Sequence, residues 1–172
     1  LGKQTIDTVT KNELESINNL DGANRGINTL TGIEELSSLK FLNLNGNNIS
    51  NISDINWSKL NSLIILDLGY NSINNLSGFD VSGLNLLQQL YLNNNSIREV
   101  NVVNCLQILD LRTNNISNLN GTNWDTLNSL VTLNLDNNKI YNLSGVAWNS
   151  MTNLETIDVV NQSITLEELN YT

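Results

Sequence analysis

The chain has 172 residues, no histidine, one cysteine and a formal net charge of −9, from 17 acidic and 8 basic side chains. The absence of histidine removes the commonest general base and metal ligand, and the single Cys105 cannot form an internal disulfide. An acidic surface repels nucleic acids and anionic membranes, and no apolar run is long enough for membrane insertion.

The first predicted element is a short helix that begins after Thr10. Thr10 and Glu13 have the spacing of a capping box, in which the two residues satisfy each other's backbone N–H groups. Three apolar residues would share one face of this helix: Leu14, Ile17 and Leu20. Residues 21–36 then form a degenerate copy of the pattern that follows. We therefore interpret residues 1–38 as an N-terminal cap with a degenerate first repeat.

Six copies of the pattern L-x-x-L-x-L-x-x-N-x-I come next and occupy residues 39–164. Successive copies are offset by 24, 24, 19, 24 and 24 residues, and their first residues are Leu39, Leu63, Leu87, Leu106, Leu130 and Leu154. The fourth and sixth positions alternate with polar residues, so both side chains point to the same side of a short strand. One copy cannot enclose a core, whereas stacked copies can.

This period predicts a leucine-rich-repeat solenoid. We expect an α/β solenoid, a right-handed coil with a curved parallel β-sheet on its concave face. Short helical or 3₁₀ turns would cover the convex face. Because strands of neighbouring coils pair at about 4.8 Å, the leucine and isoleucine side chains would form continuous ribs.

The ninth position predicts a ladder of asparagines. An asparagine amide has donors and acceptors that can satisfy backbone groups at the corner of each coil. The first five copies supply Asn47, Asn71, Asn95, Asn114 and Asn138. Gln162 replaces asparagine in the sixth copy, which indicates that the regular stack is ending there.

Tryptophans mark the back of three copies. Trp57, Trp124 and Trp148 each lie six residues before the first leucine of a copy. Tryptophans at equivalent repeat positions are typical of a core and not of a ligand site. Val81 takes this position in the third copy, and the fourth copy lacks five residues here, so we expect extended chain in place of its helical turn.

The N-terminal segment also resembles a known family. Its residues Asp7-Thr8-Val9-Thr10, Glu13-Leu14, Gly26-Ile27 and Gly32-Ile33-Glu34-Glu35-Leu36 are similar to the cap and first repeat of internalin-like surface proteins of Gram-positive bacteria. The resemblance implies an adhesin or invasin module, secreted and associated with the cell wall, with a role in virulence. It also implies that residues 165–172 form a C-terminal edge before a downstream domain, and that the targeting signal and wall anchor lie outside this sequence.

The third, fifth and seventh positions of each strand should face outward and line the concave surface. Apolar and aromatic residues recur there beside aspartates, as in many protein interfaces. The candidate binding residues are Phe41, Ile65, Asp67, Tyr70, Tyr91, Ile108, Asp110, Arg112, Asp136 and Asp158. Alternatively, the apolar residues only pair across strands. Arg112 and Asp136 would form a surface ion pair, and the aspartates do not provide the oxygen cage that calcium needs.

No nucleophile with a base, metal-ligand spacing or phosphate-binding loop appears, so neither catalysis nor a cofactor is predicted. The leading hypothesis is a monomeric, extracellular module that binds a host or neighbouring-cell protein with a basic or mixed apolar surface. One alternative is an intracellular regulatory scaffold resembling leucine-rich-repeat subunits of protein phosphatases. Another is a structural spacer between other domains.

Overall fold

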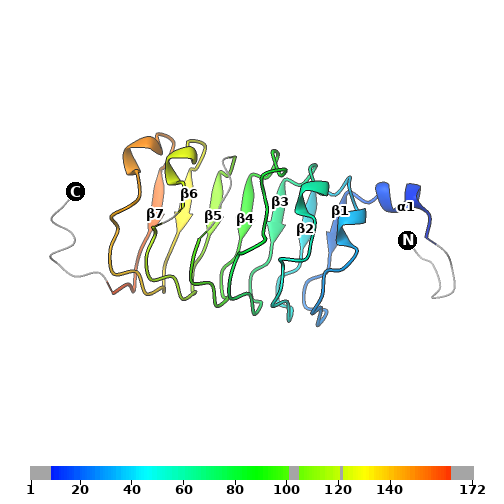
Figure 1. Cartoon of the computed structure of the whole chain (residues 1–172), viewed down its shortest axis with the longest axis horizontal. Coiled ribbons are helices and arrows are strands. Elements are labelled where there is room, and N and C mark those ends of the chain that lie inside the picture. Colours follow the sequence, from blue (N-terminus) through cyan, green and yellow to red (C-terminus); the bar gives the residue numbers. More distant parts are fainter. Residues whose placement is uncertain (1–8, 101–104, 121, 164–172) are drawn as a thin grey trace.

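The computed structural model describes residues 9–100, 105–120 and 122–163, which form one coil. Within these residues, seven three-residue strands make a parallel sheet in sequence order (Figure 1). They are β1 (Asn19–Asp21), β2 (Phe41–Asn43), β3 (Ile65–Asp67), β4 (Gln89–Tyr91), β5 (Ile108–Asp110), β6 (Thr132–Asn134) and β7 (Thr156–Asp158). The predicted leucine-rich-repeat coil is therefore confirmed.

The sheet keeps every copy of the pattern in the same register. Leu42 pairs with Leu66, Leu66 with Leu90, and Leu90 with Leu109. Along the coil, the leucines of the fourth and sixth positions and the isoleucines of the eleventh are buried against each other from the first full copy to the fifth. Apolar burial contributes about 25 cal/mol per Å², so this shared core is what makes a three-residue strand stable.

The helix α1 (Lys11–Glu15) begins with the predicted capping box. The Glu13 N–H donates to Thr10 Oγ1 over 3.3 Å, and the Thr10 N–H donates to Glu13 Oε2 over 2.8 Å. Leu14 and Ile17 are half-buried and pack against the end of the core.

Leu20 does not belong to this helix, contrary to the sequence prediction. It lies in β1 and pairs with Leu42, because the backbone on both sides of it hydrogen bonds to β2. β1 therefore belongs to a further coil, with Gly22 at its sixth position. A Cβ at Gly22 would lie 3.2 Å from Leu44 Cδ2, so the neighbouring leucine already fills this space.

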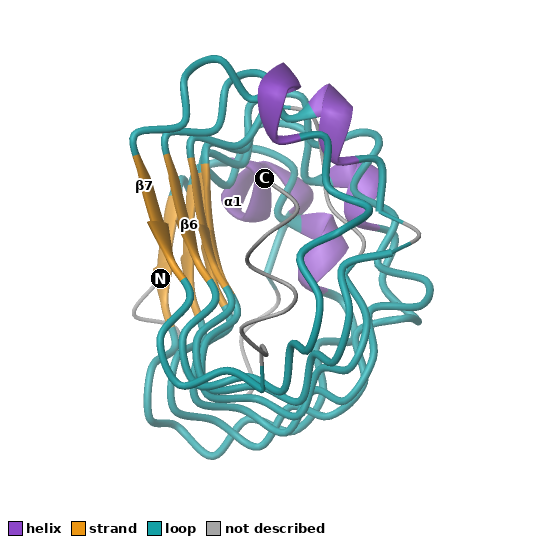
Figure 2. Cartoon of the chain, turned by 90° about the vertical axis from the view of Figure 1, so that its left-hand side faces the viewer, coloured by secondary structure: helices purple, strands orange, loops and turns teal. Residues whose placement is uncertain are grey.

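Short 3₁₀ turns lie on the opposite side of the coil from the sheet (Figure 2). They are η1 (Ile33–Glu35), η2 (Trp57–Lys59), η3 (Trp124–Thr126) and η4 (Trp148–Ser150). Trp57 and Trp124 are buried as predicted, and their indole N–H groups donate to the carbonyl oxygens of Ile52 and Leu119. Trp57 also packs edge-to-face against Phe79, with ring centroids 5.0 Å apart.

Between β3 and β4 the back of the coil consists of turns, and Val81 is buried in place of a tryptophan. The prediction of extended chain in the shortened fourth copy concerns residues 101–104, which lie outside the described residues.

The chain leaves each strand through a residue in the left-handed conformation. The seven residues at this eighth position have φ between 53° and 69°: Asn24, Gly46, Tyr70, Asn94, Thr113, Asn137 and Asn161. Glycine and asparagine adopt this conformation readily, whereas a bulky or β-branched residue is strained in it. Tyr70 and Thr113 are therefore the two unfavourable residues of the row.

Candidate functional site

Three rows of side chains face outward along the sheet, and the pairing of the strands fixes their members. Row three contains Asn19, Phe41, Ile65, Gln89, Ile108, Thr132 and Thr156. Row five contains Asp21, Asn43, Asp67, Tyr91, Asp110, Asn134 and Asp158. Row seven lies two residues further along and contains Ala23, Asn45, Gly69, Asn93, Arg112, Asp136 and Val160.

The apolar candidates form two groups in row three. Phe41 and Ile65 are direct neighbours on β2 and β3, and 40% of Phe41 is exposed. Ile108 is half-buried, and Gln89 on β4 separates it from Ile65. The apolar surface is therefore interrupted by one amide. Tyr70 lies outside the three rows, at the corner after β3.

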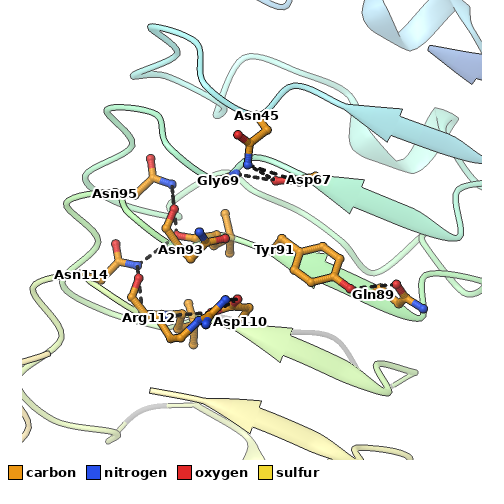
Figure 3. Close-up of polar contacts among 12 residues, drawn as sticks. Asn45, Asp67, Gly69, Gln89, Tyr91, Asn93, Asn95, Asp110, Arg112 and Asn114 are labelled. Carbon is orange, nitrogen blue, oxygen red and sulfur yellow. Dashed lines mark hydrogen bonds and ion pairs between the residues drawn. The ribbon is translucent and has the colours of Figure 1, made fainter. Parts of the chain in front are cut away.

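Tyr91 lies at the centre of row five, between Asp67 and Asp110 on the neighbouring strands. Its phenol donates a hydrogen bond to Gln89 Oε1 over 3.0 Å (Figure 3). Burial raises the pKa of this phenol, and the negative charges of Asp67 and Asp110 raise it further, because each disfavours the phenolate. Tyr91 thus presents a neutral ring edge within an acidic row.

Arg112 forms its ion pair with Asp110, so the predicted pair with Asp136 is wrong. Arg112 Nη2 lies 2.6 Å from Asp110 Oδ2, and Nε lies 2.9 Å from Oδ1. The two residues are i and i+2 on one strand face, where the guanidinium fork matches the carboxylate. Asp110 is only 2% exposed, so the pairing compensates a buried charge. The hydrogen bonds and the charge of Asp110 raise the pKa of Arg112.

Asp136 and Asp158 occupy other environments. Asp136 Oδ1 accepts the backbone N–H of Val160 over 2.7 Å, which ties β7 to the preceding coil. Both aspartates are half-buried. Among the described residues, neither has a Lys or Arg nitrogen within 4.0 Å.

Three residues of row seven that the sequence prediction did not select lie beside Tyr91 on the concave face: Asn45, Gly69 and Asn93 (Figure 3). Asn45 Nδ2 donates to Asp67 Oδ1 over 3.2 Å, and the Gly69 N–H donates to the same oxygen over 2.8 Å. A Cβ at Gly69 would lie 2.7 Å from Asn93 Oδ1 and 2.9 Å from Asn45 Nδ2. The missing side chain therefore lets the two amides approach. The seventh-position spacing could have identified all three residues.

The ninth-position side chains hydrogen bond between coils. Asn95 Oδ1 accepts the Ile73 N–H over 2.9 Å, and Asn95 Nδ2 donates to the carbonyl oxygens of Leu68 and Leu92. Equivalent bonds to the adjacent coil are made by Asn47, Asn71, Asn114 and Asn138. Gln162 makes the same contacts, with Oε1 accepting the Ile140 N–H and Nε2 donating to the Leu135 carbonyl. The change to glutamine therefore does not interrupt the series.

The described part of the chain holds no group of three acidic, histidine or cysteine residues arranged to bind a metal ion. No helix in the described part reaches the length and apolarity that crossing a bilayer requires. Cys105 is half-buried; its thiol donates to the Leu84 carbonyl over 3.3 Å, and burial raises its pKa.

Comparisons with known proteins agree with this geometry. The leucine rich repeat family model matches residues 28–97 and 105–164. No curated protein matches the chain significantly. The functional domain of InlJ from Listeria monocytogenes, which includes a cysteine ladder, superposes with a TM-score of 0.71 at 24% identity, over 98% of this chain and 40% of its own.

Two further solved structures are similar. An internalin, InlF, from Listeria monocytogenes is 26% identical with a TM-score of 0.53, over 95% of this chain and 60% of its own. A chain of the LRIM1/APL1C complex is 23% identical with a TM-score of 0.65, over 77% of this chain and 24% of its own. The chain thus spans less than two thirds of these proteins.

Proposed function

The chain belongs to the leucine-rich-repeat family, and from this premise we propose that it is the recognition module of a bacterial cell-surface protein. It binds a host or neighbouring-cell protein through its concave sheet, outside the cell or at the cell wall. The observation that carries this proposal is the set of outward-facing apolar and aromatic side chains beside aspartates on rows three and five, of which Phe41 is exposed and Ile65, Tyr91 and Ile108 are half-buried.

The proposal is supported by outward-facing aromatic side chains that the core of the coil does not require. Phe41 points away from the core, and its exposure costs hydration free energy that a polar residue would avoid. Aromatic and aliphatic centres surrounded by charge are typical of protein interfaces. Tyr91 offers such a centre, because its ring lies between two carboxylates, and within the described part of the chain only Asp110 of the two is paired with an arginine.

The surface location and the bacterial origin are supported by the likeness to two internalins of Listeria monocytogenes. Protein binding is supported by the likeness to a chain of a two-protein complex. The net charge of −9 favours a partner with a basic or mixed apolar surface.

The test is capture of membrane proteins from host cells by the immobilised chain. A variant with Phe41→Ala, Ile65→Ala and Tyr91→Ala removes the apolar side chains of the concave face. A matched variant with Leu86→Ala and Tyr141→Ala removes exposed apolar side chains of comparable size outside the sheet.

A protein captured by the native chain and the matched variant, and lost with the concave variant, is the expected result. Equal capture by all three proteins would place the binding site elsewhere. If none of them retains a membrane protein, the intracellular scaffold or the spacer becomes the better interpretation. Circular dichroism of both variants checks that the coil is intact.

A further inference from the structure

Tyr70 occupies a backbone position for which it is poorly suited. Its φ is 53°, and five of the six equivalent residues in the other coils are glycine or asparagine. A tyrosine in this conformation brings its Cβ close to its own backbone, which asparagine tolerates better. The fold would therefore be more stable with asparagine at this position. Strained residues of this kind concentrate at functional sites.

The side chain of Tyr70 makes few contacts that could offset the free-energy cost of this backbone conformation. It is 57% exposed, and its phenol makes no hydrogen bond within the described part of the chain. The backbone N–H of Tyr70 donates to the Asn93 carbonyl over 2.9 Å, a bond that any residue would make. The tyrosine side chain thus contributes exposed aromatic area, and within the described residues no hydrogen bond of its phenol holds it to the coil.

Tyr70 lies close to the polar residues beside Tyr91. It follows Asp67, the last residue of β3, by three residues and comes directly after Gly69. Its backbone N–H donates to the carbonyl of Asn93, which precedes Arg112 in row seven, and the negative charge of an ionised Tyr70 phenol is the last of the causes that raise the pKa of Arg112. Tyr70 therefore borders the region that contains Gly69, Asn93 and the Asp110–Arg112 ion pair.

Asp67 is the carboxylate of this region that lacks a positive partner. It accepts hydrogen bonds from Asn45 and Gly69, but no cation of the described residues lies within 4.0 Å. Tyr91 is its direct neighbour on β4. A carboxylate beside an aromatic ring suits a lysine or arginine side chain, which pairs with the charge and packs on the ring.

Building on the proposed function, we infer that Tyr70 anchors the binding surface and that the partner is a basic polypeptide segment. A lysine or arginine of this segment pairs with Asp67 beside Tyr91, and an adjacent part of the segment packs on the Tyr70 ring. The excess of 17 acidic over 8 basic residues in the chain provides the complementary long-range attraction.

The first measurement is the thermal stability of Tyr70→Asn and of the matched variant Thr113→Asn. Both substitutions replace an unsuitable residue of the same row with the residue most common there. We expect each to raise Tm by roughly 2–4 °C. A lower Tm for Tyr70→Asn would show that the ring stabilises the coil, and this result would overturn the inference.

The second measurement uses random-sequence peptides displayed on phage and selected on the whole native chain. We expect the recovered peptides to be rich in lysine or arginine. Their affinity should fall at least about tenfold for Tyr70→Asn and for Asp67→Asn, as for the loss of an interface anchor. Affinity for Thr113→Asn should equal that of the native chain.

The outcomes separate the inference from the proposed function. Unchanged affinity for Tyr70→Asn, or recovery of acidic peptides, overturns the inference about the anchor and its partner. The proposed function then still stands if the variant lacking Phe41, Ile65 and Tyr91 loses binding. If that variant also binds normally, concave recognition fails as well. Recovery of no peptide overturns the basic-segment inference, and the membrane-protein capture then decides the proposed function alone.

Discussion

Asn95 shows how one side chain links two coils. Its amide satisfies the Ile73 N–H and two carbonyl groups, which alanine would leave without partners at the corner. We expect Asn95→Ala to lower the free energy of unfolding by about 1–3 kcal/mol. Urea unfolding followed by circular dichroism measures this change. Ser96→Ala, at the exposed neighbouring residue, is the control and should change stability little.

The phenol of Tyr91 makes the stability of the folded chain depend on pH in the alkaline range. Its pKa in the folded state is raised above the ordinary value of 10.0, so folding favours the protonated form. The corresponding stability is fully present below pH 10 and is lost as the pH rises through the folded-state pKa. We expect the stability of the native chain to fall more steeply above pH 10 than that of Tyr91→Phe. Parallel stability curves for the two proteins would contradict this explanation.

The sequence predicted which residues line the concave face more reliably than which of them pair. Spacing placed Asp110, Arg112 and Asp136 on the outer surface, but it could not choose between the two carboxylates. The choice depends on side-chain geometry, since the guanidinium reaches back along its own strand to a buried carboxylate. Tyr70 was selected as a candidate for the concave face, whereas its place at the left-handed corner after β3 became visible only in the structure.

At the scale of elements, three of the coils have a tryptophan at the back. Trp124 is buried, and its indole donates to the Leu119 carbonyl over 2.7 Å, whereas Trp148 in the last 3₁₀ turn is half-buried with a bond of 3.3 Å. We expect Trp124→Ala to cost about 3–5 kcal/mol and Trp148→Ala clearly less. Denaturant unfolding of both variants provides the comparison. Equal losses would indicate that the terminal coil is as well packed as the central ones.

The N-terminal elements show why a pattern can be missed. The capping box of Thr10 and Glu13 was predicted correctly because it is a local motif with fixed spacing. Strand β1 was not predicted, because Gly22 replaces the expected leucine and the apolar spacing of Leu14, Ile17 and Leu20 also fits a helix. Pairing with β2 decides between the two, and this tertiary contact leaves no local signal.

For the whole molecule, the period of the pattern was sufficient to predict the coil. A stack of repeats also implies that the terminal coils are locally less stable than the central ones. Each coil contacts only its neighbours. Ile157 of β7 is 38% exposed, while the equivalent Leu133 of β6 is fully buried. Amide exchange should therefore be faster at Thr156 in β7 than at Leu92 after β4. Equal protection at these two amides, measured by hydrogen exchange and NMR, would contradict this gradient.

The asparagine-based corners have a consequence for the chemical ageing of the protein. Spontaneous deamidation converts asparagine to aspartate, which carries a charge and cannot donate hydrogen bonds when ionised. At Asn114 or Asn138 this conversion would place a negative charge in a buried corner and face it with carbonyl oxygens. A single modified corner would weaken the contact between two coils, so the useful lifetime of the protein depends on how well folding protects these amides.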